Sequence, residues 1–196
     1  LNIGKTTTKN VTDQRVRATV KLTKQDSETG AVPQGDATLE NAVYGLYARE
    51  DIVHPDGTTG VIHKAGTLIT SLKTDKNGEA SVSDLYLGKY YVKEVKTAHG
   101  YVLDKEPRYV DLSYRDQDTP VITYDEKWQN ARQKVKVTVL KKEKDTERVL
   151  AGGVYGLYTS ENIKNAKGEV LLEKDSLIEQ RVTDEKGQIT FTADLP

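Results

Sequence analysis

The sequence predicts an all-β chain, and three observations support that prediction. Short runs alternate apolar and polar residues with the period of two that is typical of strands, as in Val16–Lys24 and Val135–Lys141. Dipeptides that favour tight turns, such as Asp56-Gly57 and Asn77-Gly78, separate these runs. No amphipathic stretch of helical length is present, although residues 164–175 are compatible with either a short helix or a loop.

The composition excludes several classes of protein. The 29 basic and 30 acidic residues are interspersed and give a formal net charge of −1, so the basic face that nucleic acids or anionic membranes attract is missing. No apolar stretch approaches the roughly 20 residues of a membrane-spanning helix, so we expect no direct membrane insertion. The chain has no cysteine, and its three histidines lack the spacing of metal ligands. We therefore expect no disulfide, no metal and no cofactor.

An internal repeat indicates how the chain is organised. Val43–Tyr47 recurs unchanged as Val154–Tyr158, and Thr74–Glu79 recurs in related form as Thr183–Gln188. The two offsets, 154 − 43 = 111 and 183 − 74 = 109, are nearly equal. Two copies of one module in tandem explain this agreement.

The repeat also predicts where the modules begin and end. We expect residues 1–10 to be a linker or the end of a preceding module, and residues 11–131 to form one complete domain. Residues 132–196 would form an incomplete second domain, because the first copy continues beyond the point that matches the last residue of the chain. The chain starts at Leu1 and contains no Met, and we expect it to be part of a longer protein.

Two charged residues occupy positions where the alternation predicts core. Lys24 shares one face of its run with the apolar residues Val16, Ala18, Val20 and Leu22. In Tyr90–Glu94, the same alternation places Glu94 with Tyr90 and Val92. Either residue alone is explained most simply as a strand end that reaches solvent. Two opposite charges in one core are harder to explain in this way, because a buried charge is costly unless it is paired, neutral or chemically joined.

Four segments follow one another in a recognisable order: Lys24–Gly30, Asn41–Tyr47, Gly88–Glu94 and Gly100-Tyr101. Together they resemble the Cna B-type (SpaA-like) domains of Gram-positive pilins and surface adhesins. The resemblance extends over residues 11–196, and it implies an antiparallel β-sandwich of the prealbumin-like, inverse immunoglobulin-like kind, in tandem modules. Ala98 replaces the proline of the family's turn, a departure that concerns the stiffness of the loop rather than chemistry.

The resemblance also implies a chemistry for the core charges. Domains of this family form an intramolecular isopeptide bond between a first-strand Lys and a last-strand Asn, promoted by a Glu. Carried over, these are Lys24 and Glu94, with Asn130 as the expected acceptor because it lies 141 − 130 = 11 residues before the next module's lysine, Lys141. Asp125 is the weaker acceptor candidate. Lys141 would be the crosslinking lysine of the second module, but its partner is absent from the chain.

The expected function is structural. The chain would be a stalk or shaft module of a secreted Gram-positive cell-surface adhesin or pilus, anchored to the cell wall through parts of the parent protein that the chain does not contain. Its partners would be neighbouring modules of the same protein. The alternative is an adhesin module that recognises a host matrix protein or glycan through loops such as 32–40 or 51–64. No nucleophile–base pair, metal set or phosphate-binding loop favours an enzyme, so the only reaction expected is the single-turnover crosslink.

Overall fold

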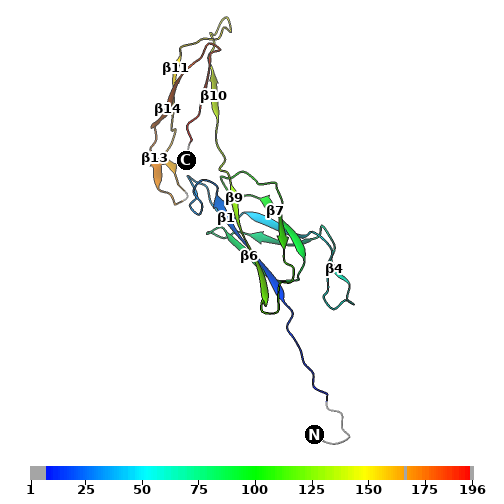
Figure 1. Ribbon diagram of the computed structural model, residues 1–196. Coiled ribbons are helices and arrows are strands. Elements are labelled where there is room, and N and C mark those ends of the chain that lie inside the picture. Colours follow the sequence, from blue (N-terminus) through cyan, green and yellow to red (C-terminus); the bar gives the residue numbers. More distant parts are fainter. Residues whose placement is uncertain (1–7, 166, 195–196) are drawn as a thin grey trace, which may run out of the picture.

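The computed structural model describes residues 8–165 and 167–194, and the regular elements in these ranges are all strands (Figure 1). Most of the linker predicted at residues 1–10 lies outside the described residues, and residues 8–16 have no regular secondary structure. The prediction of an all-β fold is confirmed.

Two sheets form the first lobe of the molecule. One sheet has the order β6-β1-β9, and its strands are β1 (Arg17–Asp26), β6 (Glu79–Leu85) and β9 (Val121–Asn130). The other has the order β5-β2-β7-β8, and its strands are β2 (Val43–Ala48), β5 (Leu68–Lys73), β7 (Lys89–Lys96) and β8 (Arg108–Asp111). A short hairpin of β3 (Ile52–Val53) and β4 (Val61–His63) projects from this lobe (Figure 1).

The alternation in β1 separates core from solvent as predicted. Ala18, Val20 and Leu22 are buried, whereas Lys21 on the opposite face is exposed. These side chains pack with buried residues of the other sheet, among them Tyr44 and Leu46. Lys24 continues the buried face of β1, so its side chain enters the core rather than the solvent.

The first and last strands of this lobe run parallel. β1 pairs with β9 in unbroken register from Arg17 opposite Val121 to Asp26 opposite Asn130. The other pairs of strands in the described residues are antiparallel. The predicted antiparallel sandwich is therefore correct except for this pair, because alternation identifies the faces of a strand but not its direction.

The remaining strands form three two-stranded ladders in a second lobe (Figure 1). The pairs are β10 (Val137–Leu140) with β15 (Gln188–Phe191), β11 (Val154–Tyr158) with β14 (Leu177–Val182), and β12 (Ile163–Lys164) with β13 (Val170–Leu172). The stretch 164–175, which was ambiguous in the sequence, therefore contributes to a hairpin. The run predicted from Val135 begins only at Val137, and Val135 is exposed.

This second lobe buries little apolar surface. Among its described residues, the buried hydrophobic side chains are Ile189 and Phe191. Tyr155 and Leu157, the repeat counterparts of the buried Tyr44 and Leu46, are only half-buried. The reason is topological: β2 pairs on both sides, with β5 and β7, whereas within the described part of the chain its counterpart β11 pairs only with β14.

Charged side chains link the two lobes. The largely buried guanidinium of Arg132 lies 2.7 Å from the Asp194 carboxylate, and the Lys134 ammonium bridges Asp194 (3.1 Å) and Glu28 (3.2 Å). Nearby, the Gln133 N–H donates to the Gly100 carbonyl at 2.7 Å. The segment that follows β9 is therefore attached to the first lobe by backbone and side-chain contacts.

The difference in core size gives a prediction about local stability. We expect amide hydrogens of β1, β2, β7 and β9 to exchange much more slowly than those of β10–β15, because strands with few buried contacts open at lower free energy. Hydrogen exchange measured by mass spectrometry on the intact chain tests this. Equal protection of residues 137–191 and 17–130 would mean that the second lobe is self-sufficient and that the predicted division into 11–131 and 132–196 is misplaced.

Candidate functional site

Three strands bring the predicted residues Lys24, Glu94 and Asn130 together in the core. The Lys24 Nζ on β1 lies 2.7 Å from the Asn130 Oδ1 on β9 and 3.3 Å from the Glu94 Oε1 on β7. The Asn130 Nδ2 lies 2.7 Å from the other carboxyl oxygen, Glu94 Oε2. At most 3% of any of these residues is exposed. The amine, the carboxyl and the carboxamide therefore form one closed triangle of contacts.

Burial shifts the Lys24 amine towards its neutral form. Burial lowers the pKa of Lys24 below its ordinary value of 10.5, although the nearby Glu94 carboxyl opposes part of this effect. The Nζ also donates to the Thr97 hydroxyl at 3.3 Å and lies 4.7 Å from the centre of the Tyr101 ring. An amine with a lowered pKa holds more of its nucleophilic neutral form near neutral pH than an exposed lysine does.

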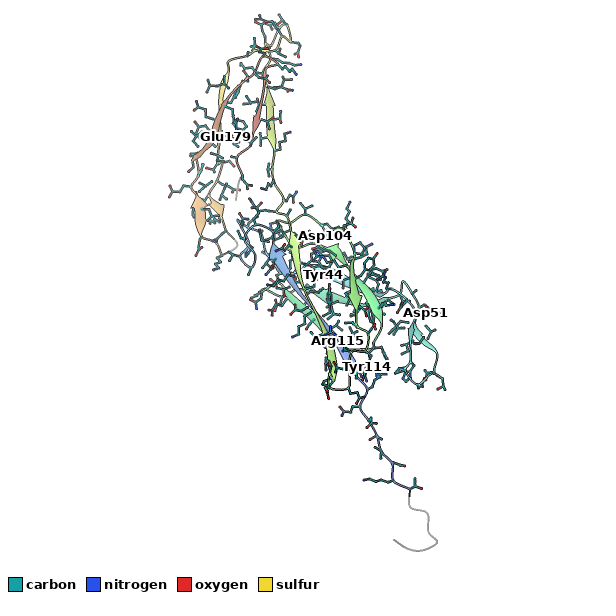
Figure 2. All side chains as sticks on the ribbon, viewed as in Figure 1. Tyr44, Asp51, Asp104, Tyr114, Arg115 and Glu179 are labelled. Carbon is teal, nitrogen blue, oxygen red and sulfur yellow. The ribbon has the colours of Figure 1, made fainter. Side chains whose placement is uncertain are left out.

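The Glu94 carboxyl is fixed by four donors, two on each oxygen. Oε1 accepts from the Lys24 amine and from the Tyr44 hydroxyl at 3.4 Å. Oε2 accepts from the Asn130 amide and from the backbone N–H of Asp104 at 2.7 Å. Tyr44 lies within the first lobe and Asp104 close to its upper end (Figure 2). The carboxyl thus touches the amine with one oxygen and the carboxamide nitrogen with the other.

The orientation of the Asn130 side chain follows from its hydrogen bonds. Its Nδ2 has two partners, Glu94 Oε2 and the backbone carbonyl of Val102 at 2.9 Å, and because the carbonyl can only accept, the atom beside it must be the nitrogen. Its Oδ1 therefore faces the Lys24 amine. The carboxamide carbon is presented to the amine while its nitrogen is held on the side of the carboxyl.

Asp26 is a third buried charge beside the site. Its carboxylate accepts from the backbone N–H groups of Glu28 and Thr29 and from the Tyr101 hydroxyl, at 2.7, 3.1 and 3.1 Å. Burial alone would raise the pKa of Asp26, but these hydrogen bonds outweigh it and lower the pKa below 3.8. Asp26 thereby shapes the turn after β1 and holds the Tyr101 ring next to Lys24.

Aromatic side chains form one wall of the site. The ring of Trp128, fully buried, lies 4.9 Å from that of Tyr44, and the Arg108 guanidinium lies over the Trp128 ring at 4.1 Å. In register, Trp128 is the residue of β9 opposite Lys24. This apolar wall keeps the amine and the carboxyl away from water, which strengthens their interactions.

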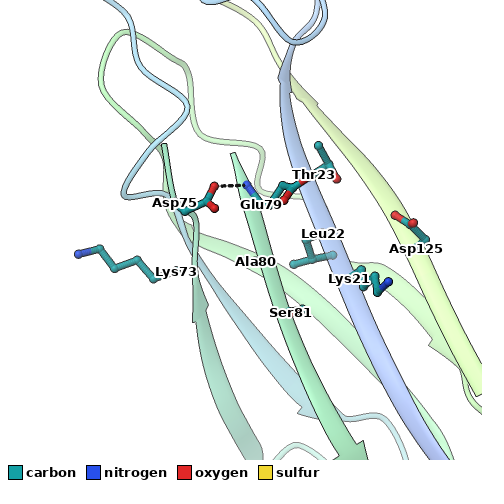
Figure 3. A pocket seen from close by; sticks show the side chains of 9 residues that line it. All are labelled: Lys21, Leu22, Thr23, Lys73, Asp75, Glu79, Ala80, Ser81 and Asp125. Atoms are coloured by element: carbon teal, nitrogen blue, oxygen red, sulfur yellow. Dashed lines mark hydrogen bonds between the residues drawn. The ribbon is translucent and has the colours of Figure 1, made fainter. Parts of the chain in front are cut away.

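The weaker acceptor candidate, Asp125, lies elsewhere. It is exposed, pairs with Lys21 across the β1–β9 ladder, and lines a polar surface hollow with Lys21 and Glu79 on the outer face of the sheet (Figure 3). It lies five positions before Asn130 in the strand, an odd offset, so it points to the opposite face of β9. The structure therefore does not bring Asp125 to Lys24.

Lys141, the lysine predicted for the second module, has no comparable surroundings. It is half-buried, and its Nζ lies 5.9 Å from the centre of the Tyr155 ring. Among the described residues, its amine donates no hydrogen bond to a carboxyl or carboxamide group.

Sequence reasoning missed several contributors to the site. The sequence patterns do not identify Tyr44, Thr97, Val102 or Asp104 as contributors. Val102 and Asp104 act through backbone atoms, for which side-chain patterns carry no signal. The described residues contain neither a cluster of metal-ligating side chains nor a helix long and apolar enough to cross a membrane.

Comparison with known proteins identifies the family. A model of the family described as SpaA, prealbumin-like fold domain, matches residues 18–128. The chain belongs to this family. The fold and the SpaA-like resemblance predicted from the residues are thereby confirmed.

Several solved structures are similar to this chain at low sequence identity. The Bacillus anthracis TIE protein is 20% identical with a TM-score of 0.54 over 90% of this chain and 26% of that one. The streptococcal ancillary pilin is 21% identical (TM-score 0.43; 91% of this chain, 50% of that one). The Corynebacterium diphtheriae major pilin SpaA is 20% identical (TM-score 0.44; 59% and 31%). This chain thus spans half or less of the length of each. No curated protein matches it.

The hydrogen bonds of Asp26 predict a pH-dependent contribution to stability. Asp26→Ala would leave the Tyr101 hydroxyl and two backbone N–H groups without their acceptor, at a cost of about 2–3 kcal/mol in the free energy of unfolding at pH 7. Because the folded-state pKa lies below 3.8, the contribution of the charged carboxylate is present above pH 3.8 and is lost as the pH falls below it. Urea unfolding at several pH values measures both effects.

Asp125→Ala is the matched control, since it removes an exposed carboxylate from the same sheet. The difference in unfolding free energy between the Asp26 and Asp125 variants should shrink as the pH falls below 3.8. A difference that did not depend on pH would contradict the role of the charge.

Proposed function

We propose that this chain is a structural module of a Gram-positive cell-surface protein, a pilus shaft or adhesin stalk, in which Lys24 and Asn130 become joined by an isopeptide bond. One observation carries the proposal: the Glu94 carboxyl contacts the attacking amine through Oε1 and the leaving nitrogen through Oε2. Membership of the SpaA family supports the proposal, since the resemblance of this chain to the family's pilin and adhesin domains implies the same bond.

The proposed reaction balances without any other reactant. The lone pair of the neutral Lys24 Nζ attacks the Asn130 side-chain carbonyl carbon, and the bond from that carbon to Nδ2 breaks. The Glu94 carboxyl takes up the proton that Nζ loses and delivers a proton to the departing nitrogen. Ammonia leaves, a secondary amide remains, and the carboxyl is regenerated.

Fixed proximity supplies most of the rate. Primary amides are inert towards amines in water, but well-oriented groups within one molecule reach effective molarities that remove about 7–11 kcal/mol from a barrier. The 2.7 Å contact of Nζ with the carboxamide and the burial of all three groups meet this condition. Glu94 would thus promote one self-reaction, and the chain would not be an enzyme that turns over a substrate.

The topology explains what such a bond would do under load. β1 and β9 run parallel, so a force between the start of β1 and the end of β9 shears their hydrogen-bonded ladder. A Lys24–Asn130 bond would carry the force from β1 directly to the last residue of β9. The chain between these two residues, which are 106 positions apart, would then carry none of the force. A module of this kind suits a stalk that must not extend.

The bond would also stabilise the module at rest. By analogy with disulfides, closing a loop of this length removes about 4–5 kcal/mol of unfolded-state entropy. An amide also resists reduction, which fits a chain without cysteines.

Neighbouring modules of the same protein are the proposed partners, and the proposed location is extracellular, with anchoring to the cell wall through other parts of the parent protein. The prediction that residues 132–196 belong to such a neighbouring module is part of this proposal. Recognition of a host matrix protein or glycan by the 51–64 loop, which carries the β3–β4 hairpin, is the alternative, and a glycan and matrix-protein binding screen would test it.

Intact mass is the direct test of the bond. We expect the folded chain to weigh less than its sequence by one ammonia, and a tryptic digest to contain one branched peptide with Lys24 and Asn130. Glu94→Gln and Lys24→Ala should retain the full sequence mass, and both should unfold at lower temperature because the loop is no longer closed. Lys21→Ala, an exposed lysine on the other face of β1, is the control and should lose ammonia normally.

Three outcomes would overturn the assignment. A full sequence mass in the folded parent chain would exclude the bond. Loss of water instead of ammonia would indicate an aspartate acceptor. Normal loss of ammonia in Glu94→Gln would remove the proton-transfer role given to the carboxyl.

A further inference from the structure

The irregular segment between β7 and β8 reaches into the site with two backbone groups. The carbonyl of Val102 accepts from the Asn130 Nδ2 at 2.9 Å, and the N–H of Asp104 donates to the Glu94 Oε2 at 2.7 Å. The side chain of Val102 is exposed, so this residue turns its backbone to the core and its side chain to solvent. Both contacts fall on the side of the triangle where the leaving nitrogen meets the carboxyl.

We propose that the segment Val102–Asp104 is a positioning element for the crosslinking reaction, in which the Asp104 N–H fixes the carboxyl of Glu94 and the Val102 carbonyl fixes the leaving nitrogen of Asn130. This inference rests on the proposed function and assigns to backbone atoms a part of that reaction. Neither group exchanges a proton or forms a bond with the reacting atoms, so both residues position and do not catalyse.

The segment is itself held in place from two sides. On one side, the Val102 N–H donates to the Ala131 carbonyl at 2.9 Å, directly after the acceptor strand. On the other side, the Asp104 carboxylate accepts from the Glu106 N–H at 3.0 Å and lies 3.4 Å from the Arg108 guanidinium. Arg108 in turn donates to the Lys127 carbonyl of β9 at 3.0 Å. Both attachments lead to β9, which carries Asn130, so segment and acceptor are fixed to each other.

The chemistry shows why this placement matters. To serve both nitrogens, the Glu94 carboxyl must lie in the plane that directs one oxygen to Nζ and the other to Nδ2. The Tyr44 hydroxyl fixes only Oε1, and without the Asp104 N–H the carboxyl could rotate away from Nδ2. Misplacement of a reacting group by about 1 Å can cost on the order of 100-fold in rate.

Two substitutions at position 104 separate the role of the backbone N–H from that of the side chain. Asp104→Ala retains the N–H and removes the carboxylate, whereas Asp104→Pro removes both. Chains purified in urea in the unreacted state would be refolded by dilution, quenched in acid at intervals, and weighed for loss of ammonia. Fluorescence of Trp128, the one tryptophan of the chain, would follow folding in the same samples.

We expect Asp104→Pro to crosslink at least 10-fold more slowly than Asp104→Ala, with the two variants folding at similar rates. Lys105→Ala, an exposed neighbour in the same segment, should crosslink at the parent rate. If Asp104→Pro does not fold, an ester in place of the amide at position 104 removes the same N–H without proline's constraints, and the same slowing is expected.

The outcomes separate this inference from the proposed function. If the parent chain never loses ammonia, both the proposed function and this inference are wrong. If the parent chain reacts and Asp104→Pro or the ester reacts at the rate of Asp104→Ala, only the positioning role is overturned. Equal slowing of Asp104→Ala and Asp104→Pro would also overturn it, since the carboxylate held by Arg108 would then be the group that matters.

Discussion

The burial of an amine, a carboxyl and a carboxamide in one apolar core is the constraint on which the rest of the first lobe depends. Three polar side chains from β1, β7 and β9 are stable there only because each satisfies the others: two oxygens of Glu94 and the oxygen of Asn130 receive the N–H groups that Lys24 and Asn130 offer. Removing any one of them leaves an unpaired polar group in the interior. The unbroken β1–β9 ladder fixes Lys24 and Asn130 relative to each other, and β7 brings Glu94 to them from the other sheet.

This constraint explains why part of the site was predictable from the sequence. Lys24 and Glu94 stand out because strict alternation places charges where only apolar residues are expected. Asn130 carries no such signal, since a polar residue at the end of a strand is ordinary, and it was identified by resemblance and by its spacing from Lys141. Asp125 was excluded only by the structure, because the face of β9 on which a residue lies depends on the register of the pairing.

Other features were beyond sequence reasoning for physical reasons. Strand direction is not encoded in the period of two, so the parallel β1–β9 pair was not foreseen. Every residue has a backbone carbonyl, and every residue except proline has a backbone N–H. The sequence therefore does not distinguish the Val102 carbonyl or the Asp104 N–H, and only the path of the chain places them at the site. The repeat predicts an incomplete second module, yet the exposure of Val135 and the hairpin at 163–172 depend on strand pairings that local pattern does not determine.

The position of the site relative to the joint between the lobes connects chemistry with mechanics. Asn130 is the last residue of β9, and Arg132 and Lys134 follow it into the cluster with Glu28 and Asp194. Glu28 belongs to the turn that is organised by Asp26, and Asp26 itself lies two residues after Lys24. A force arriving from the second lobe therefore meets the charged cluster first and then the acceptor strand at its end. A covalent bond at Lys24 and Asn130 would pass that force to β1 before it reached any other strand of the sandwich.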